Sequence, residues 1–106
     1  MITIDQFKDV ELRVATVVAA EPHPNADRLV VLRVDLGTEQ RQLVAGIRAV
    51  YDPATLVGRQ IVVVANLQPA VLRGVESQGM LLAAAGERGP VLVSPEQPVP
   101  AGAVVR

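Results

Sequence analysis

The sequence predicts a single all-β domain, a small barrel or sandwich, on three observations. Half of the 106 residues are apolar, yet only Phe7 and Tyr51 are aromatic, so valine and other aliphatic side chains must fill the core. β-Branched side chains favour strands over helices. Short apolar runs alternate with Gly, Pro, Asn and Asp breakers, and no linker divides the chain, so we expect residues 1–106 to form one domain.

The N-terminal residues carry the signal of a short helix. Thr3 and Gln6 have the spacing of a capping box, in which each side chain bonds to the backbone N–H of the other residue. Ile4 and Phe7 would share the inner face of this helix, which would end before Val10 after about two turns. We therefore expect Phe7 to belong to the core.

The hydrophobic pattern predicts the remaining elements. Apolar residues that alternate or run continuously predict five strands, at residues 11–20, 29–36, 41–45, 61–65 and 80–84. The run at 61–65 is apolar throughout, which is typical of a strand buried on both faces. Asp52 followed by Pro53 resembles an N-cap and a first-turn proline, so we expect a short helix that reaches Leu56. Residues 91–105 are rich in valine and poor in charge, and we expect them to form an extended arm.

Five short strands, with one small helix between the third and the fourth, have the order of an oligonucleotide-binding (OB) barrel. The predicted fold is thus a five-stranded OB barrel with short helices and a C-terminal extended arm. The lack of cysteine excludes disulfides, thiolate metal sites and cysteine nucleophiles. The sequence contains no signal peptide and no apolar run of about 18 residues, so we expect a cytoplasmic protein with no membrane partner.

The charge of the chain does not by itself indicate a nucleic-acid ligand, because 10 basic residues face 11 acidic ones. Nine of the basic residues are arginine, whose planar guanidinium suits phosphate, although a general bias toward Ala, Arg, Val and Pro explains this preference equally well. Several arginines would have to converge on one face to form a site. The candidates are Arg28, Arg33, Arg41, Arg48, Arg59 and Arg73. The scarcity of aromatic residues disfavours base stacking and leaves recognition of a folded RNA.

Three segments identify a family. They read EPHPNADRL at residues 21–29, VANL at 64–67 and LRGVESQGMLL at 72–82. Together they resemble the tRNA-binding domain that occurs free-standing in some bacteria and at the C-terminus of methionyl-tRNA synthetases. A related pattern in the phenylalanyl-tRNA synthetase β-chain is less similar. The resemblance implies an OB fold that pairs into a homodimer and binds the outside of tRNA without sequence preference, catalysis or cofactor.

The resemblance also implies which residues face RNA. They are Asn25, Arg28, Asn66, Arg73, Ser77, Gln78 and Met80. Family members tend to carry a basic cluster where this chain has Gln68, Ala70 and Val71, so that only Arg73 remains of the cluster.

Several of these residues have a second interpretation. His23 lacks the three or four ligands of a zinc site, and either shapes a tight connection or contacts RNA. Ser77 has no partner for nucleophilic catalysis, and its hydroxyl either donates to RNA or satisfies the backbone beside Gly79. Met80 is either core or surface, with core favoured. Gly74 and Gly79 suit a bulge or a sharp bend.

We expect a non-catalytic, sequence-nonspecific tRNA-binding homodimer that could assist an aminoacyl-tRNA synthetase. The family pattern begins almost at Met1 and ends at Arg106, which favours a free-standing module that acts in trans. The N-terminal residues and the arm at 91–105 are expected to form the dimer contact. The alternative is a dimeric, chaperone-like module that binds proteins or peptides, since residues 70–72 are apolar and the basic cluster is missing.

Overall fold

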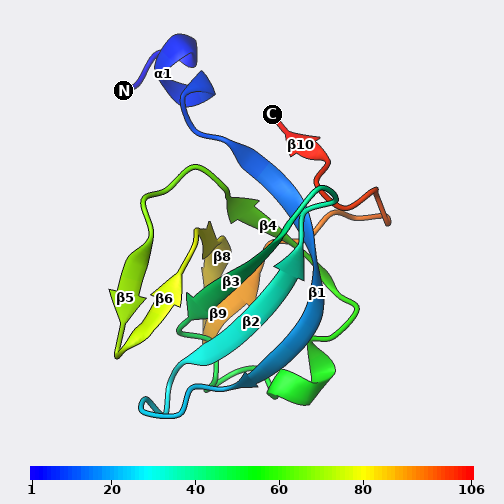
Figure 1. The fold of residues 1–106 in the computed structure, drawn as a ribbon. Helices are drawn as coiled ribbons and strands as arrows, with labels where there is room; N and C mark the ends of the chain where they lie inside the picture. The colour runs from blue at the N-terminus through cyan, green and yellow to red at the C-terminus, as the bar shows by residue number, and fades with distance from the viewer.

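The alternating apolar residues fold into strands that wrap around one core (Figure 1). The computed structural model describes residues 1–106. Its helical parts are α1 (Ile4–Lys8) and the 3-10 turn η1 (Pro53–Thr55). The strands are β1 (Leu12–Pro22), β2 (Val30–Asp35), β3 (Gln40–Ala45), β4 (Gln60–Val64), β5 (Ala70–Leu72), β6 (Val75–Ser77), β7 (Met80–Leu81), β8 (Ala83–Gly86), β9 (Gly89–Leu92) and β10 (Val104–Val105). The predicted all-β class is confirmed.

The long strand β1 organises a nearly closed antiparallel barrel. The sheet runs in the order β3-β2-β1-β4-β7, with β10 beside the start of β1. The first part of β1 pairs with β4, from Leu12 to Thr16, and the second part pairs with β2, from Thr16 to Pro22. The register shifts between Val17 and Ala19, and an irregularity of this kind bends a strand. One continuous strand therefore contributes to both sides of the barrel.

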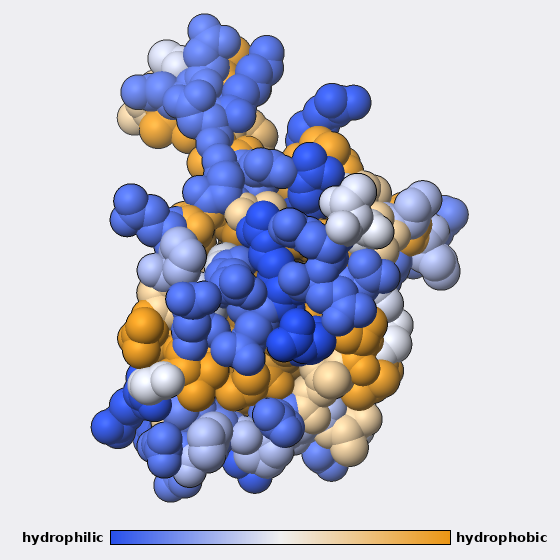
Figure 2. Space-filling view, viewed as in Figure 1, coloured by the Kyte–Doolittle hydropathy of each residue, from blue (hydrophilic) through white to orange (hydrophobic).

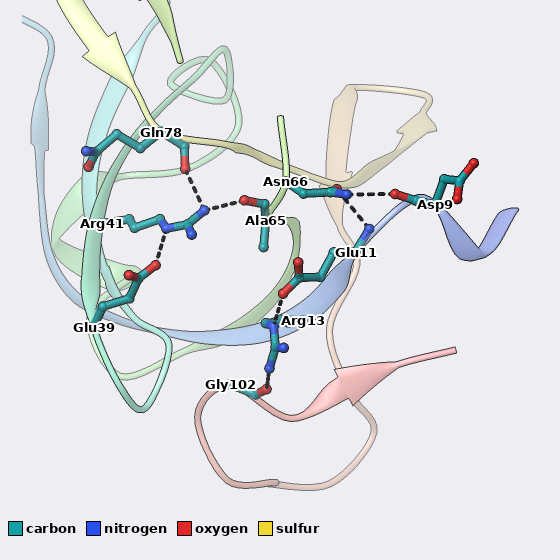
Figure 3. Close-up of polar contacts among 9 residues, drawn as sticks. All are labelled: Asp9, Glu11, Arg13, Glu39, Arg41, Ala65, Asn66, Gln78 and Gly102. Atoms are coloured by element: carbon teal, nitrogen blue, oxygen red, sulfur yellow. Dashed lines mark hydrogen bonds and ion pairs between the residues drawn. The ribbon is translucent and has the colours of Figure 1, made fainter. Parts of the chain in front are cut away.

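A few specific contacts join β3 to the segment before β7. The backbone N–H of Gln78 donates to the carbonyl of Gln42 at 2.8 Å. The guanidinium of Arg41 donates to the carbonyl of Ala65, which follows β4, and to that of Gln78 (Figure 3). The barrel thus closes through individual bonds at this seam instead of through a long ladder.

Aliphatic side chains fill the core, as predicted. The largest buried cluster contains 13 residues, and those on β2 are Val30, Leu32 and Val34. Of the residues between them, Arg33 is exposed and Val31 is buried outside this cluster. Residues Ile61, Val62 and Val63 of β4 are all buried, which confirms a strand covered on both faces. Tyr51 packs at the edge of the core cluster.

The N-terminal helix forms as predicted, with both capping-box bonds between Thr3 and Gln6 in place. Its expected inner face is not buried in the single chain. Ile4 is 67% exposed and Phe7 is 36% exposed. Figure 1 shows the physical reason, since α1 lies beyond the end of the barrel and does not cover its core. The prediction that Phe7 belongs to the core is therefore wrong for one chain.

The C-terminal third of the chain is more structured than the sequence indicated. The predicted strand at 80–84 divides into β7, which pairs with β4, and β8, which pairs with β9. The arm then runs back along the barrel, where the side chain of Gln60 bonds to both backbone groups of Val99. None of the helices is long and apolar enough to cross a membrane.

Candidate nucleic-acid interface

A hairpin outside the five predicted strands presents Arg73. Strands β5 and β6 pair from Ala70–Ser77 to Leu72–Val75, so only two residues form the turn. Arg73 has a φ of 53° and Gly74 a φ of 87°, which is the pattern of a type I′ turn. The apolar residues on both sides of Arg73-Gly74 are the signal that could have predicted this hairpin. The hairpin projects from the barrel and leaves Arg73 exposed (Figure 1).

The loop at residues 23–29 lies beside this hairpin and presents two further candidate residues. The N–H of His23 donates to the carbonyl of Leu29 at 3.0 Å and closes the loop. Asn25 and Arg28 are exposed on it. The His23 ring is buried and bonds to the backbone on both sides, near Leu72 and Asn25, which supports its interpretation as a shaper of the connection. The structure contains no group of three His, Cys, Asp or Glu residues that could hold a metal ion.

A third segment carries Arg48. The sequence does not show that this residue lies next to Arg28. The backbone N–H of Arg48 donates to the carbonyl of Arg28 at 3.2 Å, and the side chain of Arg48 is exposed. The two segments lie 20 residues apart in sequence, and no local pattern links them. Arg28 belongs to the 23–29 loop, Arg48 to a segment whose backbone bonds to Arg28, and Arg73 to the turn after Leu72, whose carbonyl bonds to His23. We call these three residues the arginine cluster.

No residue of the arginine cluster forms an ion pair within the chain. The two ion pairs of the structure join Arg13 to Glu11 and Arg41 to Glu39, away from the cluster (Figure 3). Asp27 and Glu76 are exposed nearby in sequence, so the surface around the cluster carries both signs of charge. The guanidinium groups of the cluster therefore remain available to an external anion.

Three of the other arginines make contacts within the chain instead. Arg13 donates to the carbonyl of Gly102 at 2.9 Å and holds the C-terminal arm, and Arg41 bridges the seam of the barrel. Arg59 lies over the ring of Tyr51, with 5.7 Å between its guanidinium carbon and the ring centroid. Arg33 is exposed on β2, opposite Gln42.

Ser77, one of the predicted RNA-facing residues, is enclosed by the fold, which favours the structural interpretation of its hydroxyl. Its side chain is 1% exposed. The hydroxyl accepts from the N–H of Val44 at 2.9 Å and donates to the carbonyl of Gly79 at 2.7 Å. This geometry agrees with the alternative interpretation, in which the hydroxyl satisfies backbone groups beside Gly79. Gln78 is half-buried, and its side-chain oxygen accepts from the N–H of Gln42 at 3.0 Å.

Asn66 and Met80 also make contacts within the fold. The Asn66 side chain accepts from the N–H of Glu11 at 2.9 Å and donates to the carbonyl of Asp9 at 2.6 Å, so it fixes the link between α1 and β1 (Figure 3). Met80 is half-buried and pairs with Val64. Of the seven predicted RNA-facing residues, only Asn25, Arg28 and Arg73 combine exposure with a side chain that forms no hydrogen bond to the rest of the chain.

The surface near the cluster is partly apolar. Val71 on β5 is 69% exposed, and Ala70 is exposed beside it. Figure 2 shows polar residues over the middle of the face formed by β1, β2 and β3, and an exposed apolar belt below them. The missing basic residues at 68–71 therefore leave an apolar edge next to Arg73.

Comparison with known proteins places the chain in a family. Residues 12–104 match the family model described as a putative tRNA binding domain. The methionine–tRNA ligase of Thermococcus kodakarensis is 50% identical over 105 residues, which are 99% of this chain and 14% of that protein. The chain thus spans a small part of the curated relatives that it matches.

Solved structures share the whole fold. A MetRS-related protein from Pyrococcus horikoshii superposes with a TM-score of 0.93 at 37% identity, covering 100% of this chain and 98% of that one. The chaperone CsaA of Bacillus anthracis superposes with a TM-score of 0.92 at 30% identity, covering 100% and 99%. Since the family model spans nearly the whole chain and relatives are about half identical over its length, the chain belongs to the tRNA-binding domain family.

Proposed function

We propose that this domain binds tRNA without preference for base sequence and without catalysis of its own. The observation that carries the proposal is the arginine cluster of a barrel of the tRNA-binding family: three exposed arginines without ion pairs come from the 23–29 loop and from two segments hydrogen-bonded to it. Guanidinium forks suit phosphate oxygens, and phosphate contacts carry no sequence information. Phe7 lies on α1, and Tyr51 packs against the core while its hydroxyl accepts from the N–H of Leu92, so neither ring offers a stacking surface beside the cluster and the contact is with the backbone of a folded RNA.

The number of cations in the cluster sets the expected salt dependence of tRNA binding. Each phosphate contact contributes roughly 0.7 to 0.9 to the slope of log affinity against log salt. The cluster alone therefore predicts a slope of about 2 to 3, and an affinity that falls steeply with added salt.

We further propose that the domain delivers tRNA to an aminoacyl-tRNA synthetase in the cytoplasm. Methionine–tRNA ligases about half identical to this chain match it over 14 to 16% of their own length. A module that binds the outside of tRNA raises the local concentration of substrate around a synthetase, whether it is linked to that enzyme or associates with it.

A homodimer is part of the same proposal. The two ends of the chain line an apolar groove of about 590 Å³, formed by α1, the start of β1 and β10. Ile4, Phe7 and Val104 line it and are 67%, 36% and 52% exposed. An isologous contact with a second copy would bring these equal surfaces together and remove them from water. The dimer would also double the number of arginine clusters.

A second candidate function is binding of unfolded protein. One edge of β5 is free, because β5 pairs only with β6, and it carries the exposed Ala70 and Val71. An extended peptide could add to such an edge. The structural similarity to the chaperone CsaA favours this candidate, while the unpaired arginine cluster favours RNA.

One experiment tests the proposal against this candidate. The protein is titrated with bulk tRNA and, separately, with a reduced, unfolded polypeptide, each at two salt concentrations. We expect tRNA binding that weakens steeply with salt. Binding of the polypeptide alone, or tRNA binding that does not respond to salt, would contradict the proposal.

A further inference from the structure

One buried histidine connects two of the segments that carry the arginine cluster. His23 follows β1 directly and is 5% exposed. The N–H of Asn25 donates to its Nδ1 at 2.9 Å, and its Nε2 lies 2.9 Å from the carbonyl oxygen of Leu72. The ring therefore spans from the 23–29 loop to strand β5.

These contacts define the tautomer of the ring. Nδ1 accepts a hydrogen bond from Asn25, so it carries no proton. The proton of the neutral ring is then on Nε2, which donates to Leu72. Both nitrogens are satisfied, and the flanking Pro22 and Pro24 restrict the backbone on either side of the histidine.

The bond from His23 to Leu72 links strand β5 of the hairpin directly to the 23–29 loop. Strand β6 is held to the barrel through Ser77 and through the carbonyl of Glu76, which accepts from the Gln42 side chain. Strand β5 pairs only with β6, and the ring of His23 is its one other hydrogen-bond partner. Leu72 directly precedes the turn that carries Arg73.

We propose that His23 is a positioning residue for RNA, whose ring sets the separation between Arg73 on the hairpin and Asn25 and Arg28 on the loop. The inference rests on the proposed tRNA-binding function. Phosphates are regularly spaced along an RNA backbone, so contacts from two segments add only if the segments are held at a fixed distance. Without the bond to β5, the hairpin can move about its β6 attachment and Arg73 contributes less.

Two substitutions separate this role from a merely structural one. In His23→Gln the side-chain nitrogen reaches the position of Nε2 and still donates to Leu72. In His23→Asn the side-chain oxygen takes the position of Nδ1 and still accepts from Asn25, but the side chain is too short to reach Leu72. Each variant loses one buried bond, so their stabilities should fall by similar amounts.

The binding of tRNA should distinguish the variants. We expect His23→Asn to bind about fivefold more weakly, with a salt slope lower by roughly 0.7 to 0.9, because the contact of Arg73 is lost. His23→Gln should remain within about twofold of the unchanged protein. In a background of Arg73→Ala, His23→Asn should have no further effect on affinity.

An NMR measurement on the unchanged protein covers the case in which His23→Asn does not fold. The ring nitrogens should show the neutral Nε2–H tautomer, and the amides of Arg28 and Gly74 should shift together as tRNA is added. A ring protonated on Nδ1, or shifts of only one of the two amides, would overturn the inference.

The possible failures are distinguishable. Equal losses of affinity in His23→Asn and His23→Gln, or a loss that persists beside Arg73→Ala, would overturn the inference and leave tRNA binding intact. Failure of the unchanged protein to bind tRNA would overturn the proposed function and the inference with it.

Discussion

The hydroxyl of Ser77 accepts a hydrogen bond from the N–H of Val44 at 2.9 Å, and this bond fastens β6 to β3 at the seam of the barrel. The same hydroxyl donates to the carbonyl of Gly79. A residue of the motif that identified the family thus holds two strands of the barrel together, and both bonds of its hydroxyl lie within the chain.

Ser77→Ala should therefore destabilise the fold and leave binding intact. The substitution leaves the N–H of Val44 and the carbonyl of Gly79 buried without a partner, which lowers the free energy of unfolding by about 1 to 3 kcal/mol. Urea denaturation measures this change, and the exposed Ser94→Ala is the control. A stable variant with reduced tRNA affinity would show that Ser77 contacts RNA after all.

Removal of a single cluster arginine should have the opposite effect. Arg28→Ala, Arg48→Ala and Arg73→Ala should each lower tRNA affinity and reduce the salt slope by roughly 0.7 to 0.9, with little change in the thermal midpoint. Arg59→Ala is the matched control, because Arg59 is also exposed but lies over Tyr51. Filter-binding titrations at several salt concentrations give the slopes. Equal effects for Arg59 and the cluster would mean that the cluster is not the site.

Restoring cations beside Arg73 should strengthen binding. The substitutions Gln68→Lys, Ala70→Arg and Val71→Lys replace exposed residues, so they should not disturb the core. Three working phosphate contacts would steepen the salt slope by about 2 to 3. An unchanged slope would mean that this edge does not face RNA, and would favour a protein ligand on Ala70 and Val71.

A charge in the terminal groove should separate the proposed dimer. Ile4→Asp places a carboxylate on an apolar groove wall, while aspartate in the first turn of α1 is compatible with the helix. We expect a dimer for the unchanged protein and a monomer for the variant by light scattering at about 10 µM. Val57→Asp is the control, since Val57 is 54% exposed outside the groove. An unchanged protein that is already monomeric would contradict the proposed dimer.

Two glycines with nearly the same φ should tolerate alanine differently. Gly58 and Gly102 have φ values of 90° and 89°, but a Cβ on Gly58 meets nothing within 4 Å, whereas on Gly102 it lies 2.1 Å from the carbonyl oxygen of Leu36. Gly58→Ala should lower stability by about 1 to 2 kcal/mol through strain alone. Gly102→Ala should add about 1 to 3 kcal/mol of overlap and loosen the C-terminal arm. Equal losses in thermal denaturation would show that the arm does not pack tightly against Leu36.

The sequence by itself determined the elements whose causes are local. The alternation of Val30, Leu32 and Val34 defined the inner face of β2, and the capping box of Thr3 and Gln6 defined α1. Asp52 and Pro53 likewise defined η1. Each of these patterns acts within a few residues along the chain, so it can be recognised without the fold. The motif segments identified the family for the same reason.

Only the tertiary structure decided which polar residues remain free. Ser77 and Asn66 belong to the recognised motifs, but partners 33 and 55 residues away occupy their side chains. Arg48 lies in none of the motif segments, yet the fold places it against Arg28. A hydrogen-bonding group is available to a ligand only if no distant segment satisfies it, and the partners are known only once the strands are packed.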